Sequence, residues 1–190
     1  MHVKILIAGL GNMGSEYENT RHNVGFKIAD ALAAKYNVLF SSDRYAHVSE
    51  LKIKNKHVML IKPTTFMNLS GNAVRYWMQK EKIDIQNILI LVDELALPFG
   101  TIRIKGSGSD GGHNGLKNIQ ETLQAQNYPR LRFGIAAEYT KGRQVDYVLG
   151  EWTREEKKLL PLKIERSVKA IETFCLAGLN NAMNEFNKKA

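Results

Sequence analysis

Short apolar runs alternate with segments of helical period along this chain. Residues 3–8 form a β-branched-rich run that closes on Gly9, and residues 88–92 are wholly apolar, so both are predicted to be buried strands. From Val24 the apolar residues recur at helical spacing, with Ile28 and Leu32 on the same face. This alternation is typical of an α/β fold, in which helices cover a sheet.

The remaining pattern extends the same architecture. Further strands are predicted at residues 48–53, 57–61, 101–105 and 131–136, and helices at 70–80 and around Leu116, Ile119 and Leu123. Residues 101–105 follow Asp93 too closely for a helical crossover, so the sheet should be mixed and not purely parallel. With 190 residues, the chain suffices for one domain and hardly for two. We therefore predict a single-domain three-layer α/β/α fold over residues 1–190, with a twisted, mostly parallel mixed sheet.

The last part of the chain is predicted to be helical from about residue 153. Thr153 and Glu156 have the spacing of a capping box, in which each side chain bonds to the backbone N–H of the other residue at a helix start. Pro161 should kink or restart that helix, because proline lacks a backbone donor and clashes with the preceding turn.

Charge and cysteine content limit the partners and the compartment. Lys and Arg total 27 against 19 Asp and Glu, a net charge of +8, which favours a polyanionic partner. Residues 44–82 carry eight of the basic residues and only two acids, although a solvated lysine face would show the same pattern. The single cysteine excludes a disulfide scaffold, and no apolar run approaches the roughly 20 residues of a membrane span. We therefore expect a cytoplasmic protein that is not in a membrane.

Four polar clusters follow predicted strands or open a helix. They lie at residues 9–14 with 20–23, at 64–68, at 93–94 and at 111–115. In open α/β sheets the ligand crevice lies beyond the carboxyl ends of the strands, so these clusters are predicted to meet. Together they hold two histidines, one aspartate and four asparagines, which suits proton transfer assisted by neutral hydrogen-bond donors.

Other catalytic templates do not fit. Gly9, Gly11 and Gly14 match the dinucleotide fingerprint, but polar residues 15–23 separate them from the helix that should hold the pyrophosphate. They are more typical of a tight turn that displays Asn12. No nucleophile elbow, phosphate-binding loop or zinc-type histidine pair occurs, and Cys175 lies in an apolar stretch typical of core. What remains is a histidine that acts directly on water.

Each candidate also has a structural interpretation. His47 and His57 have the pattern of surface residues, and Asp93 could be a turn former at a strand end. Met67 could be ordinary core, with Asn68 as a helix cap. His113 has glycine neighbours that suggest a close backbone approach, and Asn114 could be the working residue beside it.

Taken together, three segments resemble one known family. Gly-Leu-Gly-Asn-x-Gly-x-x-Tyr-x-x-Thr-Arg-His-Asn-Val-Gly-Phe spans residues 9–26, Lys-Pro-x-Thr-x-Met-Asn-x-Ser-Gly spans 62–71, and Gly-Gly-His-Asn-Gly-Leu spans 111–116. In order and spacing they closely resemble bacterial peptidyl-tRNA hydrolase, over nearly the whole chain. The resemblance implies a monomeric enzyme, free of metal and cofactor, that hydrolyses the ester between a peptide and tRNA and so recycles tRNA from aborted translation.

The resemblance also implies roles for individual residues. His22 would be the general base that activates water, and Asp93 would bond to its other ring nitrogen. The remaining site residues would bind the peptide end, the scissile region or tRNA: Asn12, Tyr17, Met67, Asn68, His113 and Asn114, with Arg103, Lys105 and Arg132 on phosphates. Met13 and Ala96 depart from the proline and aspartate usual in the family, which bears on local geometry.

Two further functions stay open from the sequence alone. A non-catalytic RNA-binding protein of the same fold would keep the basic surface, although the presence of both His22 and Asp93 favours an enzyme. A nucleotide-dependent oxidoreductase rests on the glycine pattern only.

Overall fold

Seven strands form one mixed sheet in the part of the chain that the structure, a computed structural model, describes: residues 2–136 and 141–188. The strand order is β2-β3-β4-β1-β5-β7-β6. The strands are β1 (Lys4–Gly9), β2 (Ser41–Asp43), β3 (Ala46–Ile53), β4 (Lys56–Pro63), β5 (Ile88–Pro98), β6 (Ile102–Lys105) and β7 (Arg130–Ala136). The helices are α1 (Val24–Lys35), α2 (Ser70–Lys80), α3 (Asn114–Leu123), α4 (Gln144–Val148), α5 (Arg154–Ala177) and α6 (Leu179–Phe186).

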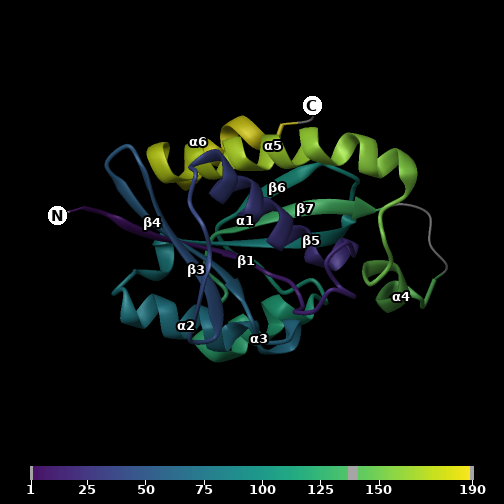
Figure 1. Cartoon of the computed structure of the whole chain (residues 1–190), viewed down its shortest axis with the longest axis horizontal. Helices are drawn as coiled ribbons and strands as arrows, with labels where there is room; N and C mark the ends of the chain where they lie inside the picture. The colour runs from purple at the N-terminus through teal and green to yellow at the C-terminus, as the bar shows by residue number, and fades with distance from the viewer. Residues whose placement is uncertain (1, 137–140, 189–190) are drawn as a thin grey trace.

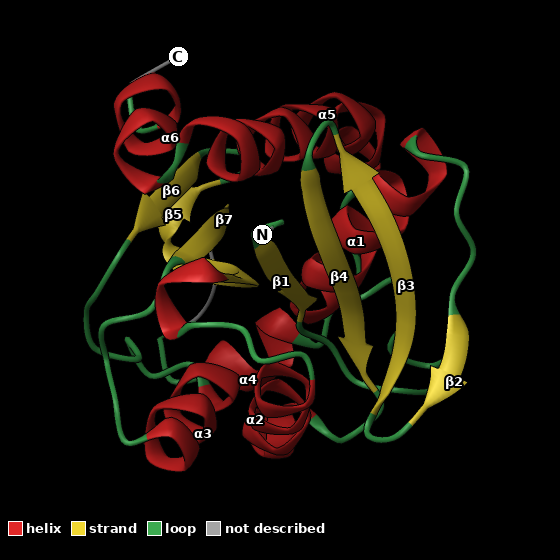
Figure 2. Ribbon diagram, turned by 90° about the vertical axis from the view of Figure 1, so that its left-hand side faces the viewer, coloured by secondary structure: helices red, strands yellow, loops and turns green. Residues whose placement is uncertain are grey.

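Helices cover both faces of this sheet, which confirms the predicted α/β class. One core joins α1, α5 and α6 to the sheet, and the other joins α2 and α3 to its opposite face (Figures 1 and 2). Within the described residues, no helix is both long and apolar enough to cross a membrane.

The sheet is mixed, as expected, with its parallel part confined to the centre. β4, β1, β5 and β7 run parallel, whereas β2–β3, β3–β4 and β6–β7 are antiparallel. Parallel pairs make up half of the strand pairs. The edge strands are antiparallel because short turns join β2, β3 and β4, and because the segment between β5 and β6 is too short for a helical crossover.

Helix α1 packs against the sheet with almost no space between the backbones. A Cβ atom at Gly25 would lie 2.5 Å from the carbonyl oxygen of Leu91, and one at Gly9 would lie 2.3 Å from that of Gly25. Only glycine fits at both positions. The helix begins at Val24, ten residues beyond Gly14, so the glycines form a turn and not the phosphate-binding start of a helix.

The predicted helical tail is present, and of the two outcomes expected at Pro161 the restart does not occur. The capping box forms: Glu156 N–H donates to Thr153 Oγ1 over 3.1 Å, and Thr153 N–H donates to Glu156 Oε2 over 2.8 Å. Helix α5 then runs through Pro161 without restarting. Pro161 is exposed, so water can bond to the carbonyl group that loses its donor, while the buried stripe of α5 keeps its packing.

Cys175 lies on the buried face of α5 and is 3% exposed. Burial raises the pKa of its thiol to about 12. This agrees with the packing role predicted from its apolar surroundings.

Candidate active site

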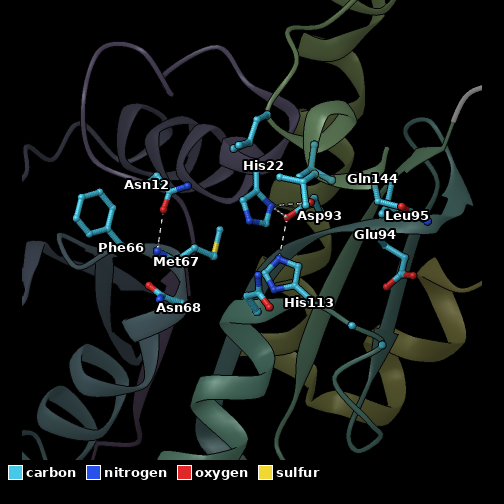
Figure 3. A pocket seen from close by; sticks show the side chains of 16 residues that line it. Asn12, His22, Phe66, Met67, Asn68, Asp93, Glu94, Leu95, His113 and Gln144 are labelled. Atoms are coloured by element: carbon cyan, nitrogen blue, oxygen red, sulfur yellow. Dashed lines mark hydrogen bonds and ion pairs between the residues drawn. The ribbon is translucent and has the colours of Figure 1, made fainter. Parts of the chain in front are cut away.

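A cavity of about 310 Å³ opens beyond the carboxyl ends of the central strands (Figure 3). All four polar clusters of the sequence contribute to its lining, because the ends of β1 and β4 meet there with the middle of β5 and the start of α3. The lining residues predicted from sequence are Asn12, His22, Met67, Asn68, Asp93, His113 and Asn114.

The centre of the cavity is a contact between His22 and Asp93. His22 Nδ1 lies 3.0 Å from Oδ1 and 2.9 Å from Oδ2 of the carboxylate. Asp93 is 4% exposed, and its burial raises the pKa of the carboxyl group, but the rings of His113 and His22 lower that pKa by more. The carboxylate is therefore ionised, and Nδ1 of His22 donates to it, so that in the neutral ring Nε2 carries the lone pair.

His22 is placed by its neighbours in the chain. It belongs to a 3-10 turn, Arg21–Asn23, that leads directly into α1, whose position on the sheet is set by the glycine contacts above. The guanidinium of Arg21 lies over the ring of Tyr147 and donates to the backbone carbonyl of Tyr147 over 3.2 Å. It also forms an ion pair with Glu156 at 3.4 Å. The turn is thus tied to α4 and to the start of α5.

Asn12 is held by two segments. Its backbone N–H donates to Asn23 Oδ1 over 2.8 Å, and Asn23 Nδ2 donates back to the carbonyl of Asn12 over 2.9 Å. The side-chain oxygen of Asn12 accepts from the N–H of Met67 over 2.7 Å. This contact sets the orientation of the amide and leaves the NH₂ group of Asn12 available as a donor.

Met67 and the two outer asparagines form the opposite side of the cavity. Met67 is 4% exposed, and the hydroxyl group of Ser70 bonds to its carbonyl over 2.7 Å. Asn68 follows Met67 in a 3-10 turn and is exposed. The N-cap position of α2 is occupied by Leu69, so the capping role considered for Asn68 is wrong. Asn114 is the first residue of α3 and is also exposed at the cavity.

His113 contacts the same carboxylate from the other side. Its Nε2 lies 2.8 Å from Asp93 Oδ1, and the centroids of the two imidazole rings are 5.0 Å apart. Figure 3 shows Asp93 between the two rings. Two histidines therefore share one buried aspartate.

These three residues also satisfy the spacing of a metal site, since one ligand atom from each lies within 4.8 Å of the others. The chemistry of the donors argues against that use. The nitrogens that face Asp93 are N–H donors in this network, and a metal ligand must present a lone pair.

The basic residues suggested by the resemblance lie outside the cavity. Arg103 and Arg132 are paired across β6 and β7, and Lys105 is exposed on β6. Arg132 bonds to the carbonyl of Ser109 over 2.9 Å and to Glu94 over 3.4 Å, beside the glycine-rich loop of the cavity. Tyr17 is half-buried in the turn before Thr20 and does not line the cavity.

The basic segment 44–82 is divided between two places. Lys52, Lys54 and Lys56 lie at the tip of the β3–β4 hairpin, next to the amino end of β1 and far from α4 (Figure 1). Arg75 and Lys80 lie on α2.

Part of the cavity wall escaped the sequence analysis. Gln144, Val145, Val148 and Leu149 of the α4 region close one side, and Leu95 lies at the rim. Helix α4 has only five residues, so it shows no periodicity to detect. Of the two departures from the family pattern, Ala96 is exposed and Met13 is half-buried, and neither lines the cavity.

Comparisons with known proteins are consistent along the whole chain. A family model described as peptidyl-tRNA hydrolase matches residues 6–190. Proteins of that name from Phocaeicola vulgatus and Azobacteroides pseudotrichonymphae are 54% and 56% identical, each over 98% of this chain and 100% of its own length. A crystal structure of peptidyl-tRNA hydrolase from Acinetobacter baumannii superposes with a TM-score of 0.91 at 36% identity, covering 98% of this chain and 96% of that one.

Proposed function

The chain belongs to the peptidyl-tRNA hydrolase family and is an esterase that hydrolyses peptidyl-tRNA, and we propose that His22 is the general base of this reaction. The observation that carries the proposal is the contact of His22 Nδ1 with the buried Asp93 carboxylate, which leaves Nε2 as the proton acceptor. Asp93 fixes the tautomer and stabilises the imidazolium ion when it forms.

The chemical steps follow from this geometry. Nε2 of His22 removes a proton from water while the water oxygen bonds to the ester carbon. The NH₂ group of Asn12 donates to the resulting oxyanion, as an uncharged donor that does not titrate. The C–O bond to the ribose then breaks, and Nε2–H returns the proton to the leaving oxygen, which frees the tRNA. The peptide leaves as the carboxylic acid and loses its remaining proton to solvent to give the carboxylate.

The other residues bind the two halves of the substrate. We assign Asn68 and Asn114 to the peptide backbone because both are exposed at the cavity with free amide groups. Met67 and the ring of His113 form the surface against which the acyl group packs. Tyr17 would lie beside the tRNA end, and Arg103, Lys105 and Arg132 would contact phosphates of the acceptor arm.

The wider assignment has three further parts. The protein acts as a monomer in the cytoplasm, it needs no metal or cofactor, and it returns tRNA from aborted translation to use. The basic net charge of +8 supports attraction to RNA without specifying its placement.

A single substrate tests both the reaction and its metal independence. Incubation with N-acetylaminoacyl-tRNA should release the acetylated amino acid at the same rate with and without a chelator. Absence of release would overturn the esterase assignment. Release that stops with chelator and returns on adding a divalent ion would overturn the metal-free mechanism.

Lys105→Ala should raise KM for this substrate and reduce the salt dependence of binding by about one counterion. Lys105 is exposed, so its loss removes one phosphate contact without disturbing packing. Lys52→Ala is the matched control, because it removes the same charge at the hairpin tip far from the cavity. The slope of log K against log salt should change only for Lys105, and equal changes in both variants would mean that only net charge matters.

A further inference from the structure

His113 occupies the N-cap position of α3, where its ring replaces the usual small polar side chain. Its Nδ1 accepts hydrogen bonds from the backbone N–H groups of Gly115, over 3.1 Å, and Leu116, over 3.3 Å. These are two of the donors that a helix leaves without partners at its start. An imidazole nitrogen that accepts from an N–H group cannot itself carry a proton.

The second nitrogen of the same ring is therefore the protonated one. Nε2 of His113 lies 2.8 Å from Asp93 Oδ1 and donates to it. Two independent sets of contacts, the helix cap and the carboxylate, thus specify the same neutral tautomer. A second proton on this ring would break the cap.

Asp93 consequently accepts from two rings at once, Nδ1 of His22 and Nε2 of His113. An ionised carboxylate divides its charge among the donors that it accepts from. The share of the carboxylate charge that the hydrogen bond from His113 uses does not stabilise a proton on His22. The contact with His113 therefore lowers the proton affinity of His22.

Among the described residues, the other charged groups around His22 do not compete for this role. Glu94 lines the cavity but pairs with Arg132. Asp110 bonds to the backbone of Gly112 within the glycine-rich loop. Arg21 turns away towards Tyr147 and Glu156, and the turn at residues 66–68 and helix α4 present no charged residue to the cavity.

We propose that His113 is a positioning residue: it sets the proton affinity of His22 by taking part of the Asp93 charge, and it fastens the start of α3, with Asn114, to the catalytic carboxylate. The proposal rests on the assignment of His22 as the general base. It gives His113 a function besides its surface contact with the acyl group, since both of its nitrogens have partners within the protein.

The tautomer can be observed without any turnover. In long-range ¹H–¹⁵N spectra of the free protein, His113 should show a protonated Nε2 and an unprotonated Nδ1 at every pH at which the enzyme is active. A proton on Nδ1, or on both nitrogens, would overturn the proposal. This result does not depend on which residue is the base, so it separates the present inference from the proposed function.

Two variants then separate the carboxylate contact from the cap. His113→Asn keeps a good N-cap acceptor but withdraws the donor from Asp93, whereas His113→Ala removes both. The acid limb of the pH–rate profile should move upward by about one pH unit in both, because His22 then holds its proton more tightly. His113→Ala should lower the melting temperature further than His113→Asn does, because it loses the helix cap as well as the carboxylate contact.

The outcomes that contradict the proposal are distinct. An unchanged or downward acid limb in His113→Asn would show that the ring does not compete for Asp93. If His22→Asn retains full activity, the general-base assignment fails instead, and the spectra of His113 remain a separate measurement.

Discussion

Replacing His22 by asparagine is expected to lower the rate of peptidyl-tRNA hydrolysis by about 10²–10⁴-fold and to leave the affinity for tRNA nearly unchanged. Asparagine can still donate to Asp93 from its amide group, so the buried carboxylate keeps a partner. It offers no basic nitrogen at the position of Nε2, so water must attack without losing its proton to the protein. The loss should therefore appear in the chemical step alone.

Single-turnover release of N-acetylated amino acid from tRNA measures that step, and anisotropy with an amide-linked analogue, which is not hydrolysed, measures binding. His57→Asn is the matched control, because His57 bonds to Glu50 at the surface, on the part of the sheet remote from the cavity. It should behave as the wild type. If His22→Asn bound tRNA more weakly but hydrolysed the bound substrate at the normal rate, His22 would be a substrate-binding residue and not the general base.

Asp93→Asn is expected to reduce turnover by about 10³–10⁴-fold, although the side chain keeps its shape. The new amide presents an NH₂ group as well as an oxygen to two rings that both donate to Asp93 in the wild type. The helix cap fixes the tautomer of His113, so His22 is the ring that must change tautomer and accept a hydrogen bond from the new amide at Nδ1. Nε2 would then carry hydrogen and could not accept a proton from water.

The same variant changes the pH dependence of stability in a predictable direction. The folded-state pKa of Asp93 lies below its ordinary value, so its ionisation stabilises the fold above about pH 4, and this contribution is lost as pH falls towards the lower folded value. Acid unfolding should be correspondingly shallower in Asp93→Asn. Asp30→Asn, which changes an exposed aspartate paired with Lys62, is the control for charge alone. A wild-type turnover rate in Asp93→Asn would show that the carboxylate is not needed to orient His22.

The meeting of the polar clusters could be predicted because it follows from topology. Clusters placed after parallel strands must come together at one edge of the sheet, whatever the loops do. Asn12 and Asp93 therefore lie where the strand pattern puts them. Strand β5, however, continues past Asp93 to Pro98, because its pairing with β7 shifts register after Glu94 and resumes. The prediction that this strand ends at residue 92 is therefore wrong, because the two charged residues Asp93 and Glu94 lie within the strand.

Other parts of the site depend on tertiary contacts that the periodicity of the sequence does not reveal. Asn23 supports Asn12 through a reciprocal pair of hydrogen bonds, which becomes visible only when the two turns are adjacent in space. Helix α4 is short and its apolar residues face the cavity, so it carries neither a helical stripe nor a strand pattern. β2 is similarly hidden, because its three residues are all exposed and polar.

Cys175 gives the molecule a reporter of its own motions. It is the single cysteine of the chain, so a thiol reagent has one target, and burial at 3% exposure together with the raised pKa keeps that target unreactive in the folded state. Labelling can then proceed only through fluctuations that lift α5 from the sheet. The rate of Cys175 labelling, measured at increasing reagent concentration, yields the free energy of that opening. The measurement needs no engineered probe and can use the same sample as the turnover assay.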